Sequence, residues 1–380
     1  MTIASLFSPE LKNFLQKIED LGFQLTLVGG APRDYLLDRS FLSFDLDFEL
    51  RGKLISELVT FLKFQNILYT ELPYNIIRIG WHGFDLEFSS PRIEKALTEN
   101  KTHHHFIAEL NPTLEYKEAF KRRDFSINAI GIELSFKNNS ESIVDPYDGI
   151  SALMSKTLKE LSSDFFLDSV RFLRLLRFMI KYNFEMSSSI EAGLYQFDLS
   201  ELSAHHFKSE MIKSGKPGIF VNAFNNLTSI YNLETPKKFE VWKNLKYLPD
   251  IENIEDLLVD TFLQNEKSAN KVADFLSIPT SKIKDLKSFH ESINKIKQTS
   301  KEEFIKIAEL PLNKVSNLEI LKNLKNLEDK KEWKSYSNDK LLISWSDWEN
   351  IQANSTELDS TPAELRSYIK YHKALKKVFT

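Results

Sequence analysis

The sequence predicts an α+β region at residues 1–150, followed by helical regions at 151–240 and 241–380. Runs with strand character lie in the first region, at 25–28, 44–48 and 75–88. From Ser151 onward the apolar residues follow helical spacing, with no tandem repeat and no low-complexity linker. The 29 Phe and only 11 Gly also favour well-packed helices.

The composition bounds the class of protein. A hydrophobic fraction of 42% and a charged fraction of 27% are typical of a soluble globular chain. The absence of cysteine excludes disulfides, thiolate zinc sites and a cysteine nucleophile, and it agrees with a cytoplasmic protein. Because the net charge is −4, any contact with nucleic acid must come from local basic patches.

No secretory or membrane segment is expected. Ser8-Pro9-Glu10 predicts a helix cap rather than a signal peptide, and the apolar residues from Leu11 to Leu21 follow helical spacing. No apolar run approaches membrane-spanning length.

The stretch from Leu25 to Glu49 carries the first candidate site. A strand-like run ends at Val28, and the pair Gly29-Gly30 then allows a tight turn and close approach of a ligand. Pro32 fits the first turn of a following helix. A strand, a glycine turn and a helix N-terminus together favour binding of an anionic phosphate, although a glycine pair alone is often only a turn.

Two acidic residues follow on the next predicted strand. Alternation places Asp45 and Asp47 on one face, with Phe44, Leu46 and Phe48 on the other. Adjacent carboxylates repel each other unless a cation lies between them, and such oxygen ligands suit Mg²⁺. An isolated Asp-x-Asp is otherwise a solvated surface.

Three later segments carry further candidate residues. On the strand at 84–88, either Asp85 or Glu87 could supply a third carboxylate, unless this is a half-exposed edge strand. In the segment 121–129, arginines offer forked donors to phosphate. Asp124 can orient the arginine or accept from a ribose hydroxyl, and Asn128 can bond ribose or phosphate. A basic helix start is the alternative there.

The third segment is a predicted helix at 167–178. Asp168, Arg171 and Arg174 recur every three residues and therefore line one side of it. The packed side is formed by Phe172, Leu175, Leu176 and Met179. Read alone, the polar side could be a salt-bridged helix surface.

These segments, in this order, resemble the nucleotidyltransferase superfamily in the form of bacterial tRNA CCA-adding enzymes and related poly(A) polymerases. The resemblance covers roughly residues 20–215. The first signature matches at Gly29, Gly30, Arg33, Asp34, Asp45 and Asp47. Later segments match at 87–92, 122–129, 145–149 and 168–178. The family alignment favours Glu87 over Asp85 as the third carboxylate.

The resemblance implies a mixed-sheet catalytic head at 1–150, a helical neck at 151–240, and a helical body and tail at 241–380 that bind tRNA. It implies transfer of CMP and AMP from CTP and ATP to the tRNA 3′ end in the cytoplasm, by a chain without membrane contact and with a monomer favoured. Asp45 and Asp47 would hold two Mg²⁺ ions, and Glu87 would assist the attacking hydroxyl. The implied nucleotide-binding residues are Gly29, Gly30, Arg33, Arg92, Arg123, Asp124, Asn128, Asp168, Arg171 and Arg174.

The chain departs from the family pattern at two places. Leu167 stands where the family has Glu, and His205-His206 replace a Glu-Arg pair. These departures leave a non-catalytic RNA-binding relative as an alternative. A poly(A) polymerase and an enzyme that adds only part of CCA also stay as alternatives, because the loops and neck contacts that separate them have no simple residue code.

Two segments have less certain patterns. Residues 93–118, which include the run from His103 to His105, are expected to form a mobile loop rather than a metal site. The lysine-rich segment 281–335 is either a solvated helical face or a surface for the tRNA backbone.

Overall fold

The structure is a computed structural model. It describes residues 2–38, 43–96, 106–246, 248, 251, 253–279, 281 and 283–284. The chain forms two compact units, Met1–Leu202 with Ile230–Glu234, and Ser203–Ser229 with Thr235–Thr380. The boundaries at 150 and 240 stay a prediction.

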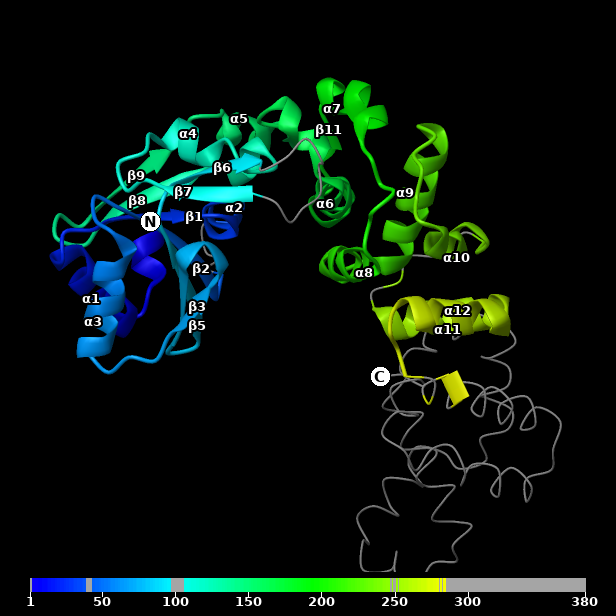
Figure 1. The fold of residues 1–380 in the computed structure, drawn as a ribbon, viewed down its shortest axis with the longest axis horizontal. Helices are drawn as coiled ribbons and strands as arrows, with labels where there is room; N and C mark the ends of the chain where they lie inside the picture. Colours follow the sequence, from blue (N-terminus) through cyan, green and yellow to red (C-terminus); the bar gives the residue numbers. More distant parts are fainter. Residues whose placement is uncertain are drawn as a thin grey trace, which may run out of the picture. The chain divides into compact units, whose positions relative to one another are not determined.

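A mixed sheet of seven described strands lies at the centre of the first unit, in the order β3-β4-β5-β2-β1-β8-β9 (Figure 1). Its strands are β1 Gln24–Val28, β2 Asp45–Arg51, β3 Thr70–Leu72, β4 Ile76–Trp81, β5 Phe84–Ser89, β8 Gly131–Ser135 and β9 Ser140–Val144. Only β2 and β5 pair in parallel within this sheet. This arrangement confirms the predicted α+β fold of the head.

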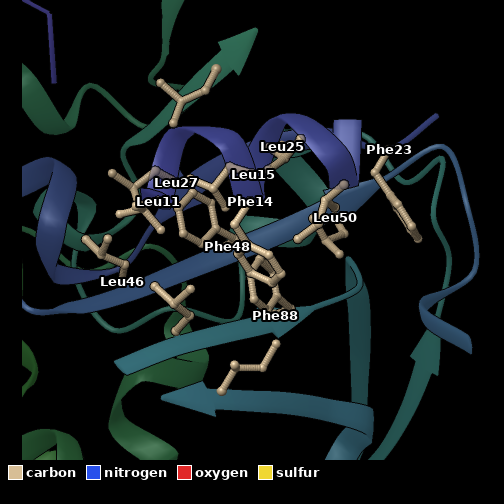
Figure 2. Close-up of a cluster of buried hydrophobic side chains, with 14 of the residues drawn as sticks. Leu11, Phe14, Leu15, Phe23, Leu25, Leu27, Leu46, Phe48, Leu50 and Phe88 are labelled. Carbon is tan, nitrogen blue, oxygen red and sulfur yellow. The ribbon is translucent and has the colours of Figure 1, made fainter. Parts of the chain in front are cut away.

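One face of the sheet is covered by a hydrophobic core to which α1 (Pro9–Asp20) and α3 (Ile55–Phe64) contribute. Helix α1 begins as predicted, because the Ser8 side chain accepts a hydrogen bond from the Leu11 backbone N–H. Its apolar stripe packs on alternate residues of β1 and β2, as Figure 2 shows for Leu11, Phe14, Leu15, Leu25, Leu27, Leu46, Phe48 and Leu50. The intervening residues of β2, including Asp45 and Asp47, therefore lie on the opposite face of the sheet.

Residues 93–118 are more regular than expected. Strands β6 (Arg92–Ala96) and β7 (Phe106–Leu110) pair antiparallel, and α4 (Tyr116–Phe120) follows. The expectation of a loop across 93–118 was therefore wrong at both ends, because two short strands satisfy each other's backbone hydrogen bonds. His103, His104 and His105 lie outside the described residues.

The rest of the first unit is mainly helical. It contains α2 (Gly30–Leu37), α5 (Gly149–Met154), η3 (Ser126–Asn128), η4 (Ser163–Leu167), α6 (Ser169–Tyr182) and α7 (Ser188–Gly193). Two short parallel strands, β10 (Thr157–Leu158) and β11 (Glu185–Met186), correct the expectation of an almost wholly helical chain after Ser151. Helix α6 begins at Ser169, so Asp168 is its N-cap and not a residue within the helix.

The second unit is helical where it is described. Its helices are α8 (Ala204–Lys213), α9 (Pro217–Ile230), α10 (Glu240–Lys243), α11 (Ile254–Gln264) and α12 (Glu266–Phe275). Aromatic rings form its core around the buried Phe207, which contacts the buried Phe224, Phe239 and Trp242 and the partly buried Phe275. Among the described helices none is long and apolar enough to cross a bilayer. Most of the lysine-rich segment 281–335 lies outside the described residues.

Candidate active site

The glycine turn and the acidic strand fit together. Val28, the last residue of β1, pairs with Asp47 of β2, and Gly29 then caps α2 with a φ of 78°. A Cβ added at Gly29 would collide with the Asp47 carboxylate, and this φ is one that residues other than glycine rarely adopt. Gly29 therefore permits both the turn and the position of Asp47.

Replacing Gly29 with Ala should remove most activity, by at least tenfold, because the new Cβ displaces the Asp47 carboxylate and strains the turn. The assay measures the rate of the catalysed reaction under single-turnover conditions, and the melting temperature is measured in parallel. Gly80→Ala is the matched control, because a Cβ at Gly80 meets nothing within 4 Å. Equal activity in the two variants would show that the turn does not depend on Gly29.

The carboxylates occupy neighbouring positions on β2 and β5. Asp45 is exposed, Asp47 and Glu87 are partly buried, and Asp47 lies opposite Glu87 in the register. Burial, followed by the charge of Glu87, raises the pKa of Asp47 to about 6. The Asp85 carboxylate instead accepts a 2.8 Å hydrogen bond from Arg78 Nε, whereas that nitrogen lies 3.9 Å from Glu87. This geometry favours Glu87 over Asp85 as the third carboxylate, although its role stays a prediction.

The donor set of Asp45 and Asp47 fits a divalent cation. The charges of Glu87 and Asp45 contribute to the raised pKa of Asp47, a positive ion would relieve this repulsion, and hard cations prefer carboxylate oxygens. No group of three or more His, Cys, Asp or Glu side chains placed to hold a metal occurs in the described part of the chain. A pair of carboxylates suffices for Mg²⁺ where substrate phosphates complete the coordination.

A cluster of arginines lies at β6 and in the segment before η3. Arg92 donates from Nε to Glu94 at 2.9 Å, and Nη1 of Arg122 lies 3.7 Å from the same carboxylate oxygen. Burial, together with the charges of Arg123 and Arg92, lowers the pKa of Arg122 to about 10. The buried Nε atoms of Arg122 and Arg123 have no hydrogen-bond partner among the residues that the structure describes. Three guanidinium groups held this close favour a polyphosphate ligand.

Arg122 was not among the predicted site residues. The sequence feature that could have identified it is the run Arg122-Arg123-Asp124, in which only Arg123 was assigned a role.

Arg33 lies at the centre of a buried polar network. Only 7% of the residue is exposed, and its Nη1 donates to Asn128 Oδ1 at 2.6 Å. Nε donates to Asp34 at 2.8 Å, and Nη2 donates to the Tyr182 hydroxyl at 2.7 Å. The guanidinium thus joins α2, η3 and α6. Tyr182 was missed by sequence reasoning.

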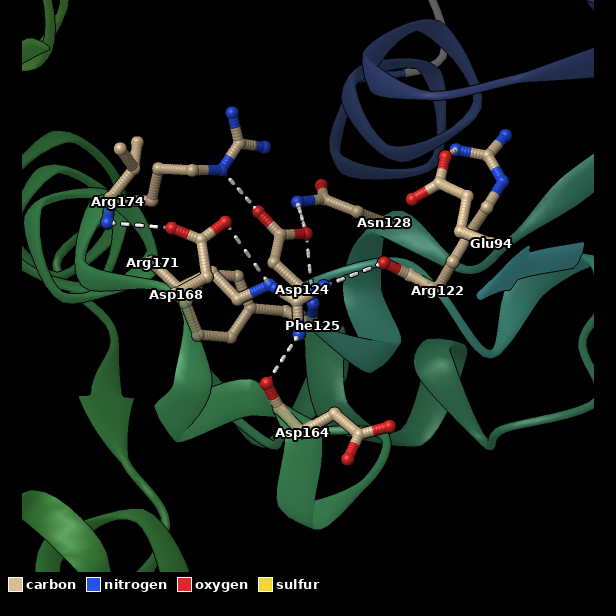
Figure 3. A network of polar contacts seen from close by, with 10 residues as sticks. Glu94, Arg122, Asp124, Phe125, Asn128, Asp164, Asp168, Arg171 and Arg174 are labelled. Atoms are coloured by element: carbon tan, nitrogen blue, oxygen red, sulfur yellow. Dashed lines mark hydrogen bonds and ion pairs between the residues drawn. The ribbon is translucent and has the colours of Figure 1, made fainter. Parts of the chain in front are cut away.

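The network continues from Asn128 to Asp124 and Arg174 (Figure 3). Asn128 Nδ2 donates to Asp124 Oδ1 at 2.8 Å, and Arg174 Nε donates to the other carboxylate oxygen. Burial alone would raise the pKa of Asp124, but Arg174, Asn128 and the Phe125 backbone N–H together lower it to about 2. Predicted nucleotide-binding residues from three separate segments are therefore joined by hydrogen bonds to one another.

Asp124→Asn should lower the free energy of unfolding at pH 7 by about 2 kcal/mol, because the folded pKa lies below the unfolded one. A depressed carboxylate pKa stabilises the fold above about pH 4, and this contribution is lost as the pH falls through 2. The free energy of unfolding in urea should be measured for both proteins at pH 7 and at pH 3. The difference between Asp124→Asn and the unsubstituted protein should be smaller at pH 3 than at pH 7. The exposed Asp20 provides the control variant Asp20→Asn. A difference that does not change with pH would contradict this account.

Asp168 and Arg171 lie at the N-terminal end of α6. Asp168 Oδ1 accepts a 2.7 Å hydrogen bond from the Val170 N–H, and Oδ2 lies 3.8 Å from Arg171 Nε. Arg171 also donates to the backbone oxygen of Arg122 at 2.8 Å. Both side chains are partly buried, and Figure 3 shows them beside Asp124. Leu167, which precedes them, is 43% exposed.

The comparisons with known proteins agree with this geometry. Residues 25–159 match the Poly A polymerase head domain. The resemblance that the signature residues predicted is therefore confirmed. The match extends from β1 through β10 and thus contains the glycine turn, the acidic strand, the arginine cluster and η3.

Curated CCA-adding enzymes are similar to this chain. The CCA-adding enzyme of Staphylococcus haemolyticus is 27% identical, with 68% of this chain and 66% of the relative covered. That of Lactobacillus helveticus is 26% identical, with 53% of this chain and 48% of the relative covered. The chain spans about half to two thirds of the length of these relatives.

Solved structures share the fold of the chain. A tRNA-processing enzyme with CTP has a TM-score of 0.57 at 19% identity, with 94% of this chain and 100% of that chain covered. A CCA-adding enzyme with ATP has a TM-score of 0.57 at 17% identity, with 99% of this chain and 91% of that chain covered. At this identity the likeness shows the fold.

Proposed function

We propose that this chain is a template-independent RNA nucleotidyltransferase that adds CMP and AMP to the 3′ end of tRNA and completes CCA. The observation that carries the proposal is the pairing of Val28 with Asp47, which places the glycine turn against the acidic strand. The names of the curated relatives support tRNA as the acceptor and CCA as the product. The solved relatives with CTP and ATP support these nucleotides as substrates.

In this proposal the 3′-hydroxyl of the RNA attacks the α-phosphate of the nucleotide, a new phosphodiester forms, and pyrophosphate leaves. Asp45 and Asp47 would hold two Mg²⁺ ions, which would supply activation of the attacking hydroxyl and stabilise the charge of the leaving pyrophosphate. Glu87, opposite Asp47, orients the hydroxyl. The turn at Gly29 and Gly30 brings the N-terminus of α2 to the phosphates.

The remaining predicted residues act on the nucleotide or on one another. Arg92 and Arg123, with Arg122, bind the triphosphate. Asp124 and Asn128 bind ribose. Arg33 and Arg174, which are hydrogen-bonded to them, hold these two side chains in place. Asp168 and Arg171 select the base.

The proposed division is a catalytic head at 1–150, a neck at 151–240, and a body and tail at 241–380 that contact tRNA. We place the protein in the cytoplasm, where its substrates are found, and expect it to act as a monomer.

The experiment is incubation of tRNA transcripts that end before, within and after CCA with one labelled nucleotide at a time. The expected result is C on the first transcript, A only after two C residues, and nothing after CCA. A run of A on every transcript would indicate a poly(A) polymerase, and activity on one intermediate only would indicate a partial enzyme. Binding without any extension would indicate a non-catalytic RNA-binding protein.

A further inference from the structure

Helix α6 carries a stripe of three side chains, two of which contact Arg33 just after the glycine turn. Arg174, Phe178 and Tyr182 are each four residues apart and therefore lie on the same side of the helix. The Phe178 ring stacks on Tyr182 with centroids 5.6 Å apart and an interplanar angle of 16°. The Arg33 guanidinium carbon lies 5.1 Å from the Phe178 centroid and 4.9 Å from that of Tyr182. The Arg33 guanidinium group therefore packs against the rings of Phe178 and Tyr182.

The Tyr182 hydroxyl makes two directional contacts at the far end of the stripe. It accepts a 2.7 Å hydrogen bond from Arg33 Nη2 and donates a 3.0 Å hydrogen bond to Asp34 Oδ1. Burial raises the pKa of Tyr182 to about 12, so the hydroxyl retains the proton that it donates. The same Asp34 carboxylate accepts from Arg33 Nε at 2.8 Å. One hydroxyl therefore holds both members of the pair that follows the glycine turn.

The opposite end of the stripe closes the network. Arg174 binds Asp124, Asp124 binds Asn128, and Asn128 binds Arg33. Helix α6 is thereby attached to the rest of the head through Arg174 and Tyr182, eight residues apart, in addition to the hydrogen bond from Arg171 to the Arg122 backbone. Because Asp168 and Arg171 lie at the start of the same helix, a rotation of α6 would move them and the Arg33–Asp34 pair together.

We propose that Tyr182 is a positioning residue that couples the base-selecting end of α6 to the phosphate-binding turn at Gly29 and Gly30. This inference rests on the proposed function and adds to it a residue outside the family signature. Without the hydroxyl, Asp34 and Arg33 each lose a partner and the turn loosens against α6. The base and the triphosphate of a correct nucleotide are then no longer held in one geometry, which lowers the rate of transfer.

The test is Tyr182→Phe, which removes only the hydroxyl and retains the stacked ring. The matched control is Tyr195→Phe, since Tyr195 is 68% exposed. Single-turnover extension of a tRNA primer should show a roughly tenfold lower rate constant of transfer with CTP and with ATP. The preference for CTP over UTP should narrow as well, while the melting temperature stays close to that of the control.

A second measurement needs no catalysis. Hydrogen exchange of the peptide that covers the turn and Arg33 should be roughly tenfold faster in Tyr182→Phe, with exchange in α1 unchanged. Unchanged exchange at the turn, or faster exchange throughout the unit, would overturn the inference. Faster exchange at the turn with an unchanged single-turnover rate constant would overturn it as well. If the unsubstituted protein extends no tRNA while exchange at the turn still responds, the proposed function fails and the coupling of α6 to the turn stands.

Discussion

Asp45→Ala and Asp47→Ala should each abolish transfer of CMP and AMP alike, with the fold retained. Both carboxylates lie on the polar face of β2 and would hold the ions that act on the phosphates, a part of the substrate that CTP and ATP share. Loss of several kcal/mol of transition-state stabilisation corresponds to a rate that is lower by roughly a thousandfold or more. The measurement is single-turnover extension with each nucleotide, with circular dichroism to verify the fold.

Asp85→Ala is the matched control for this prediction. Asp85 lies opposite Asp45 in the register, but Arg78 already binds its carboxylate. We expect Asp85→Ala to retain activity within about tenfold and Glu87→Gln to be more severe. Retained transfer in the double variant of Asp45 and Asp47 would defeat the two-metal account. A loss in Asp85→Ala equal to that in Asp47→Ala would make Asp85 the third carboxylate.

Asp168→Ala and Arg171→Ala should reduce incorporation of C and A and narrow the preference over U and G. An ionised Asp only accepts hydrogen bonds and an Arg only donates them. Cytosine and adenine each present an amino donor beside a ring-nitrogen acceptor, so one Asp–Arg pair can satisfy both bases. Uracil and guanine present a carbonyl and an N–H at these positions, which leaves groups unpaired at about 1–3 kcal/mol each.

The measurement is single-nucleotide extension of a tRNA primer with each of the four triphosphates. Asp164→Ala is the matched control, because the exposed Asp164 contacts Arg171 only through its backbone oxygen. Discrimination should stay unchanged in the control and fall by roughly tenfold or more in the two variants. A uniform loss of activity with discrimination unchanged would mean that Asp168 and Arg171 have a structural role only.

The secondary structure around the glycine turn and the acidic strand was predictable because it depends on residues that are close in the sequence. Period-two alternation placed Asp45 and Asp47 on the face opposite Leu46 and Phe48, and the structure confirms this. The glycine pair after Val28 likewise predicted the strand, turn and helix. In each case the deciding contacts lie within a few residues of one another.

The boundaries of short elements were less predictable. The recurrence of Asp168, Arg171 and Arg174 gave the correct side of α6 but not its first residue. Asp168 accepts a hydrogen bond from the Val170 N–H and so caps the helix. An Asp suits an N-cap as well as a helix surface, and spacing does not separate the two.

The partners of buried polar groups were not predictable at all. Arg33 was assigned to the nucleotide, yet its guanidinium donates to Asn128 and Tyr182, which are 95 and 149 residues away. The same chemistry that binds a phosphate also binds an amide or a hydroxyl, so residue type alone leaves the partner open. Tyr182 carried no signal except its spacing from Arg174 and Phe178.

The most direct test of the central claim supplies all four nucleoside triphosphates at equal concentration to a tRNA transcript that lacks CCA, and sequences the products. If protein side chains select the nucleotides in this head, the products end in C, C and A, and addition then stops. Products that contain U or G at these positions, a run of A, or an unextended transcript would contradict the account.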